Sequence, residues 1–413
     1  MSLFDDIELP ELPFNITRRG LFRVGAAGAV AAATVGVVNR CRRSDDETSD
    51  PVVVDDRAAN NILAEDSAYT EVDLGLSETN SWELPAGTVL RPASGVWIPA
   101  LAASSSTIPV VKAAALSTTT GTFSDVITTQ VMGNDPNTAI YDVRCSDELF
   151  AWVEIDMLNR NWALYAQHFA DGAVSGSVTT LWEGDADWDP PLFAVTGDTV
   201  IWQVMPAISG TKTRESSFCY LWHQGDRNAK AVVESPGRFA APPAVSEGTV
   251  TLAPRVRADE GVFYGITAYN LRDELATTVD QLVLPQSVRP FRAVRMGDVF
   301  VFSIEANYSS GGLLGRMGTY IGAGDGPFTT LVREPSAQVA GNNGQFIIKS
   351  RASYFVIDTI RETYSILLAT NRCVDYGEYP ASEGTCSNFV TFATVKDAET
   401  GYPSTVSVRC FAL

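Results

Sequence analysis

One unit recurs along this chain and limits what the chain can fold into. A proline-bearing loop leads into a short apolar strand, a turn with glycine or aspartate follows, and a second strand rich in β-branched and aromatic residues comes next. Residues 190–202 (PPLFAVTGDTVIW) are the clearest copy. The copies begin at prolines spaced by 45 to 55 residues, namely Pro136, Pro191, Pro243, Pro290 and Pro335, with a weaker copy near Pro85. A period of this length is typical of repeat architectures.

Each unit contains enough β-structure for a four-stranded sheet. A third strand follows the second, as at residues 162–168 or 262–269, and then a fourth, as at residues 178–182 or 280–284. Gly, Asp and Asn stand at the turns, and the sequence shows no helical periodicity over these units. The sequence therefore predicts an all-β fold, a single β-propeller of about seven four-stranded blades, with six blades as the alternative.

The number of blades depends on how the ring closes. Six units begin between Pro85 and Pro335, and residues 380–413 offer two further strands. A ring that stays open would expose the edges of its sheets. We therefore expect the last blade to be completed from the other end of the chain, by residues 69–74 or by a strand near Trp82. If there are six blades, the last hairpin is an extension.

Residues 1–43 have the layout of an export segment. Charged residues precede residues 24–38, an uncharged run rich in Ala, Gly and Val. Arg18 and Arg19, followed by Leu21 and Phe22, resemble the twin-arginine (Tat) signal. This resemblance implies export by the Tat machinery, with the protein secreted or anchored at the outer face of the cytoplasmic membrane. We expect the signal to be cleaved, and an uncleaved N-terminal anchor helix is the alternative.

The segment after the signal is acidic and polar. Residues 44–66 contain few large apolar side chains and predict a disordered linker, so the propeller is expected over residues 67–413. The whole chain has a net charge of −19. An acidic surface of this kind argues against nucleic acid and anionic lipid as partners.

The cysteines suggest one cross-link. No CxxC motif occurs among the six cysteines, which argues against a zinc ribbon or a thioredoxin-like redox site. Cys373 and Cys386 bracket a polar segment of 12 residues. Outside the cytoplasm, a disulfide between them would stabilise this loop by about 2–3 kcal/mol.

One acidic loop is a candidate for binding a cation or a ligand. Asp185, Asp187 and Asp189 have the D-x-D-x-D spacing that opens a calcium loop. The rest of that motif fails, because Pro190 stands where glycine is required and Thr196 where a bidentate glutamate is required. A solvated acidic turn is the simpler interpretation. We expect no resident metal or cofactor.

The repeat also resembles a known superfamily. Gly197-Asp198, the strand that ends at Trp202 and the Pro190-Pro191 loop are similar to the WD40-like/TolB-like propellers, over about residues 82–413. Together with Arg18-Arg19, the chain resembles exported bacterial propeller proteins. The resemblance implies a binding or scaffold role in the cell envelope, although fold alone does not define function.

The expected function is therefore that of a non-catalytic, monomeric binding module. Its partner would be an envelope protein, a glycan or a small ligand, since no GxSxG, HExxH, Walker or Rossmann motif is present. The alternative is a glycan hydrolase or lyase with acidic residues in the central funnel. Three or more Asp, Glu, Tyr or Arg side chains around the channel would favour this enzyme, and a channel filled with apolar side chains would exclude it.

The export signal makes a direct prediction. Replacing both Arg18 and Arg19 with lysine keeps the charge but removes the guanidinium pair, so the protein is expected to remain in the cytoplasm. Cell fractionation and immunoblotting measure this. Unchanged export of the double variant would show that the N-terminus is not a twin-arginine signal.

Overall fold

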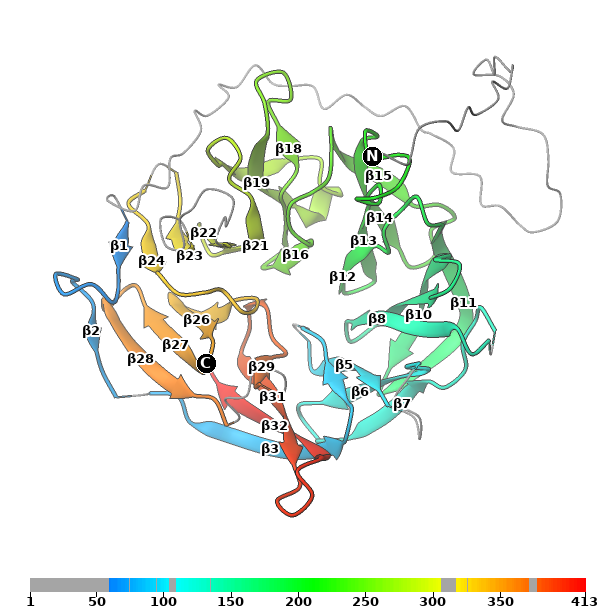
Figure 1. Cartoon of the computed structure of the whole chain (residues 1–413), viewed down its shortest axis with the longest axis horizontal. Coiled ribbons are helices and arrows are strands. Elements are labelled where there is room, and N and C mark those ends of the chain that lie inside the picture. The colour runs from blue at the N-terminus through cyan, green and yellow to red at the C-terminus, as the bar shows by residue number, and fades with distance from the viewer. Residues whose placement is uncertain are drawn as a thin grey trace, which may run out of the picture. The chain divides into compact units, whose positions relative to one another are not determined.

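The computed structural model describes residues 59–73, 75–93, 95–103, 109–133, 135–305, 317–324, 326–370 and 377–413. These residues are almost entirely β-structure, and their one helix is a single 3₁₀ turn, η1 (Leu271–Asp273). The strands form a single β-propeller, and Figure 1 shows its sheets arranged in turn around a central axis. The export signal, with Arg18, Arg19, Leu21 and Phe22, lies outside the described residues.

Six sheets are each built mainly from one continuous stretch of chain. The first is β4 (Val89–Leu90), β5 (Trp97–Ala102), β6 (Lys112–Ser117) and β7 (Phe123–Ile127). The second is β8 (Thr138–Cys145), β9 (Leu149–Asp156), β10 (Trp162–Ala170) and β11 (Ala173–Gly184). The third is β12 (Leu192–Thr196), β13 (Thr199–Val204), β14 (Ser217–His223) and β15 (Lys230–Ser235).

The next three sheets follow the same order. The fourth is β16 (Ala244–Ser246), β17 (Thr249–Leu252), β19 (Phe263–Asn270) and β20 (Thr278–Val283), with β18 (Arg255–Val256) also paired to β19. The fifth is β21 (Pro290–Met296), β22 (Val299–Ile304), β23 (Gly318–Gly322) and β24 (Thr329–Leu331). The sixth is β25 (Ala340–Asn342), β26 (Gln345–Ser350), β27 (Ser353–Asp358) and β28 (Thr363–Leu368), with β30 (Gly384–Thr385) beside β25.

A further sheet combines the two ends of the described chain. It consists of β29 (Tyr379–Pro380), β31 (Asn388–Lys396), β32 (Pro403–Ala412) and β3 (Glu78–Pro85). Strand β3 runs antiparallel to β32, with Trp82 opposite Val408. The strand near Trp82 is therefore the N-terminal strand that completes this sheet. Figure 1 shows β3 and β32 side by side at the rim of the ring.

The residues before β3 lie along the outer edges of two other sheets. Strand β1 (Asn60–Asn61) pairs in parallel with β24, and β2 (Thr70–Glu71) pairs in parallel with β28. Ile62 is buried in the core there, and the Tyr69 hydroxyl lies 3.0 Å from the Thr329 hydroxyl. Packed structure thus includes residues 60–62, at the end of the segment 44–66 whose polar composition predicts a linker.

Aromatic pairs repeat from sheet to sheet because equivalent positions of the second and third strands face each other. Trp152 lies opposite Tyr165, Trp202 opposite Tyr220, and Phe302 opposite Tyr320, with ring centroids 5.4 to 5.7 Å apart. Such pairs stabilise a sheet beyond the burial of their area. Trp202 also belongs to one apolar cluster with Leu149 and Val153 of the preceding sheet. These aromatic side chains therefore pack between neighbouring sheets and offer no platform for a ligand.

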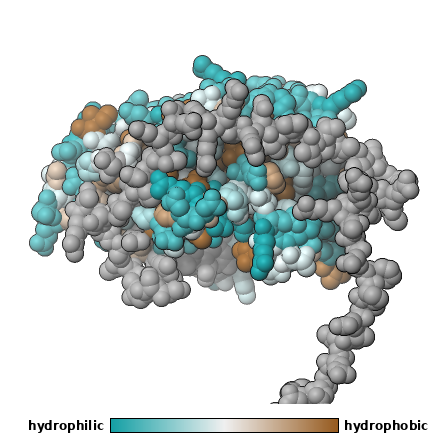
Figure 2. Space-filling view, turned by 90° about the horizontal axis from the view of Figure 1, so that it is seen from above, coloured by the Kyte–Doolittle hydropathy of each residue, from teal (hydrophilic) through white to brown (hydrophobic). Residues whose placement is uncertain are grey.

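The surface contrasts with these cores. On the face in Figure 2, hydrophilic residues predominate and hydrophobic residues form separate small patches. Among the described residues, no helix is long and apolar enough to cross a membrane.

The β3–β32 pairing can be tested with one buried side chain. Leu84 on β3 is 3% exposed and packs with Val406 and Val408. Leu84→Ala is expected to lower the free energy of unfolding by about 2–5 kcal/mol, because it removes buried methyl groups and leaves a cavity. Chemical denaturation measures the change.

The matched control lies on the same strand. Glu83 is exposed, so Glu83→Ala should change stability by no more than about 0.5 kcal/mol. Equal effects of the two substitutions would show that β3 is not packed as described.

Candidate ligand-binding site in the central channel

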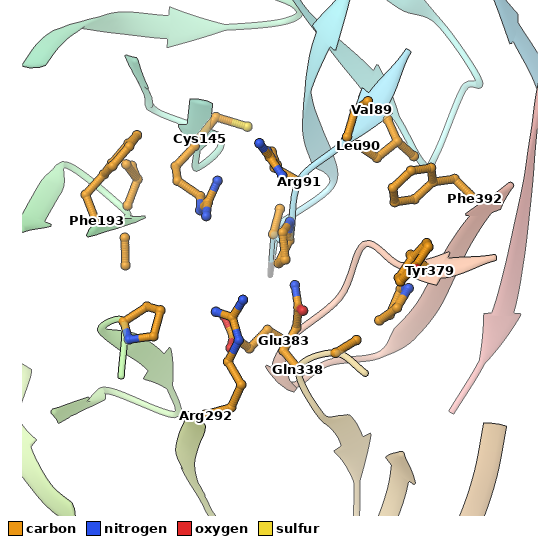
Figure 3. Close-up of a pocket in the computed structure, with 18 of the residues that line it drawn as sticks. Val89, Leu90, Arg91, Cys145, Phe193, Arg292, Gln338, Tyr379, Glu383 and Phe392 are labelled. Carbon is orange, nitrogen blue, oxygen red and sulfur yellow. The ribbon is translucent and has the colours of Figure 1, made fainter. Parts of the chain in front are cut away.

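A cavity of about 430 Å³ lies in the central channel, where the innermost strands of the sheets face one another. Its volume is within the usual range for small-molecule sites. Strands of every sheet except the sixth contribute to its wall, and Ser336, Ala337 and Gln338 line it from the loop before β25. The lining side chains include Val89, Leu90, Arg91, Arg144, Phe193, Arg292, Tyr379, Glu383 and Phe392. Figure 3 shows many of them directed toward a common space.

Residues 381–386, here called the crossing segment, run between β29 and β31 and span the channel. The Ala93 amide donates to the Ala381 carbonyl at the first sheet, over 3.2 Å. The Gly384 amide donates to the Val339 carbonyl at the sixth sheet, over 2.9 Å. The Thr385 amide donates to Ser246 Oγ, over 3.0 Å, on strand β16 of the fourth sheet. The segment is therefore held from three sides and presents Glu383 to the cavity.

Gly384 allows this close approach. Its φ of +70° is in the left-handed region, and a Cβ at this position would lie 3.0 Å from Ser246 Cβ. A larger residue would be strained by its backbone and crowded against β16.

Three arginines from three sheets point into the cavity. Arg91 follows β4, Arg144 lies near the end of β8, and Arg292 lies near the start of β21. Asp142 bridges the first two, because its Oδ1 lies 2.8 Å from Arg91 Nε and 2.7 Å from Arg144 Nη1. One carboxylate thus fixes two guanidinium groups.

Arg292 has a different environment. Its guanidinium lies 5.3 Å from the centre of the Phe291 ring, which suits a cation–π contact. Its Nε is buried and makes no hydrogen bond with any described residue. It forms no ion pair with the described carboxylates. This cation is held in place by packing more than by polar contacts.

Glu383 is the carboxyl group that lines the cavity. Burial raises its pKa above the ordinary glutamate value, and the positive charges of Arg292 and Arg144 act in the opposite direction. Burial outweighs the two arginines, so Glu383 takes up a proton more readily than a solvated glutamate does.

The cavity also contains a thiol, Cys145. Its Sγ donates to the Trp97 carbonyl over 3.4 Å. Burial, and then the nearby charge of Asp147, raise the pKa of Cys145 well above its ordinary value. A protonated, hydrogen-bonded thiol is a poor nucleophile.

The acidic loop singled out from the sequence lies apart from this cavity. Asp185 accepts from the Asp187 amide, Asp187 accepts from the Thr211 amide and hydroxyl, and Asp189 pairs with Arg238 at 2.8 Å. None of the three aspartates lines the cavity. Over the described residues, no group of three or more His, Cys, Asp or Glu side chains is arranged to hold a metal.

The predicted disulfide stays a prediction. Cys386 is buried at the end of the crossing segment, and Cys373 lies outside the described residues.

Sequence reasoning missed the cavity residues, although a signal for them exists. Arg91, Arg144 and Arg292 each fall on or directly after the first strand of a repeat unit, a strand that is otherwise mostly apolar. Aligning the units by their prolines would not show these charges, because Arg91, Arg144 and Arg292 follow Pro85, Pro136 and Pro290 by different numbers of residues. Glu383 had no such signal, because the crossing segment is not part of the repeat.

The fold and the cavity define a β-propeller with a polar, arginine-rich central channel. No family model and no curated protein matches the sequence. Solved structures resemble it at 10 to 12% identity. They include the β-propeller domain of the Trilobed protease from Pyrococcus furiosus (11% identity, 63% of this chain and 80% of that chain, TM-score 0.42).

Two further structures are similar. One is a prolyl endopeptidase (11% identity, TM-score 0.47), for which 78% of this chain matches 47% of that chain, so this chain spans less than half of that enzyme. The other is the N-terminal domain of Nup159 (10% identity, 83% of this chain and 97% of that chain, TM-score 0.47). At these levels the likeness concerns fold alone.

The raised pKa of Glu383 predicts how stability depends on pH. An unfolded glutamate has a pKa of about 4.3, and folding raises that pKa, so the folded state binds this proton more tightly. The stability that the folded protein gains from this proton is fully present below about pH 4.3 and is lost as pH rises through the folded-state pKa of Glu383. Glu383→Gln should therefore be more stable than the wild type at neutral pH and lose this advantage in acid.

Denaturation at a series of pH values measures this difference. Glu334→Gln, at an exposed position, is the matched control and should follow the wild type throughout. A Glu383→Gln profile parallel to that of the wild type would contradict the raised pKa.

Proposed function

We propose that this chain is an exported, non-catalytic binding module of the cell envelope, and that its central cavity holds a small ligand. The observation that carries the proposal is the cavity itself, in which polar side chains from several sheets converge on one space. Ligand sites are concave, with a few polar groups set among apolar ones. Export and an extracytoplasmic location rest on the twin-arginine resemblance of Arg18 and Arg19.

The chemistry of the lining supports binding more than catalysis. Glycoside hydrolysis by the common mechanisms requires two carboxyl groups flanking the scissile bond. Of the described residues that line the cavity, Glu383 alone carries a carboxyl group. The thiol of Cys145 is held protonated by burial. The cavity thus supplies charge and shape without a pair of groups for acid–base chemistry.

One observation supports the alternative function, an enzyme that acts on glycans. Three arginines, Tyr379 and Glu383 surround the channel, which meets the condition set from the sequence for an enzyme. An acidic sugar would suit these arginines, and elimination needs one base where hydrolysis needs a carboxyl pair. This second candidate is a lyase that acts on an acidic glycan.

Closing the cavity tests the proposed site. Ala194 lines the wall from β12, so Ala194→Trp should fill the space and abolish binding. Differential scanning fluorimetry with a panel of sugars, amines and organic acids is the measurement. A ligand at 100 times its Kd stabilises the folded protein by about 2.7 kcal/mol, and this gain should vanish in the variant.

Ser177→Trp, on the exposed strand β11, is the control and should bind as the wild type does. Stabilisation that survives in Ala194→Trp would place the ligand elsewhere. Mass spectrometry of the ligand after incubation separates the two candidates, because a chemically altered ligand would contradict a non-catalytic role and favour the lyase.

A further inference from the structure

We propose that the central cavity binds a small organic acid, with its carboxylate or phosphate group held by Arg292 and Arg144 beside Glu383 and its uncharged body against Tyr379 and Phe392. This inference rests on the proposed function, because it names the class of ligand for the same cavity. Four features of the described residues carry it.

The first feature is a surplus of positive charge in an acidic protein. The chain carries a net charge of −19, but the cavity wall combines three arginines with one carboxyl group. Asp142, behind the wall, is shared between Arg91 and Arg144. Three guanidinium groups therefore face two carboxylates. Such a local reversal of sign attracts an anion into the channel.

The second feature is the condition of Arg292. Its Nε is buried without a hydrogen bond to the described residues, and Arg292 forms no ion pair with a described carboxylate. A guanidinium group presents donors in a planar fork that matches the two oxygens of a carboxylate or phosphate. An oxyanion in the cavity would satisfy both its charge and its donors.

The third feature is a division of the wall into two parts. Figure 3 shows Arg292, Glu383 and Arg91 around one region, while Val89, Phe392 and Tyr379 lie to the other side. Phe193 lies beneath the Arg144 guanidinium, 5.5 Å from it, and helps to orient it. A volume of about 430 Å³ exceeds what an inorganic oxyanion fills. The wall therefore fits a molecule with one acidic end and one uncharged end.

The fourth feature is that Glu383 competes with the ligand for the same arginines. The crossing segment places this carboxyl group next to Arg292 from β21 and Arg144 from β8, the two cations that face it, while the neutral side chains of Gln338 and Tyr379 also line this space. When Glu383 is ionised it repels an incoming anion, and when it is protonated it does not. Binding of the acid should therefore take up a proton and tighten as pH falls, until the ligand itself is protonated.

Matched pairs of probes test the class of ligand. Phenylacetate is compared with phenylacetamide, glucuronate with glucose, and inorganic phosphate is measured alone, by isothermal titration calorimetry between pH 5.5 and 8. At least one acid should bind about tenfold or more tightly than its neutral partner, since a charged hydrogen-bond pair is lost in the neutral compound. Arg292→Met should weaken the binding of that acid by about ten- to a hundredfold and leave the affinity for the neutral probe unchanged.

Two more variants complete the test. Glu383→Gln should bind the acid more tightly than the wild type at pH 8 and show a flatter dependence on pH. Arg214→Met, at an exposed arginine outside the cavity, should behave as the wild type. Thermal unfolding of each variant shows that it is folded before binding is compared.

The outcomes separate this inference from the proposed function. If the neutral probes bind as well as the acids, and Ala194→Trp abolishes both, the cavity is a binding site but the organic-acid inference is wrong. If inorganic phosphate binds and neither organic acid binds better, the claim of an uncharged body is wrong. If no probe responds to Ala194→Trp, both the inference and the proposed function fail.

Discussion

The antiparallel pairing of β3 with β32 is the contact on which the rest of the ring depends. It joins residues near the start of the described chain to residues at its end, and it completes the sheet between the first and the sixth. Without β3, the outer edge of β32 would be unpaired, and the N-terminal residues that lead to β4 would lose their anchor. The aromatic pairs stabilise individual sheets and their neighbours, whereas the β3–β32 pairing joins the two ends of the described chain within one sheet.

The crossing segment turns that ring into a site. A propeller provides a channel lined by its innermost strands, and here residues 381–386 span it through hydrogen bonds to the first, fourth and sixth sheets. Gly384 is required at the point of closest approach to β16. The segment carries Glu383 to a place beside Arg144 and Arg292 that no strand of the repeat could reach. The polar groups of the cavity thus come from two sources: the arginines from the repeat units and Glu383 from the crossing segment.

The fold could be predicted from the sequence because its signal is repeated. Each unit shows the same local pattern: a proline before the first strand, alternating apolar residues, and aromatic residues at equivalent positions. This pattern predicts the same sheet each time it recurs. The site could not be predicted in the same way. Arg91, Arg144 and Arg292 are far apart in sequence, and the arrangement of the sheets around one channel brings them together. The acidic loop at Asp185 has the spacing of a calcium loop. Its carboxylates are instead bound to the Asp187 amide, the Thr211 amide and the Arg238 guanidinium.

The order in which the chain is made has a consequence for its folding. Strands β1, β2 and β3 are synthesised well before their partners β24, β28 and β32. Contacts between residues this distant in sequence carry a large loop-closure cost and form slowly. The intermediate sheets can pair while the chain is still growing, but β3 must wait until β32 has been synthesised. A growing chain that still lacks β32 would therefore have an open sheet edge for a chaperone to cover.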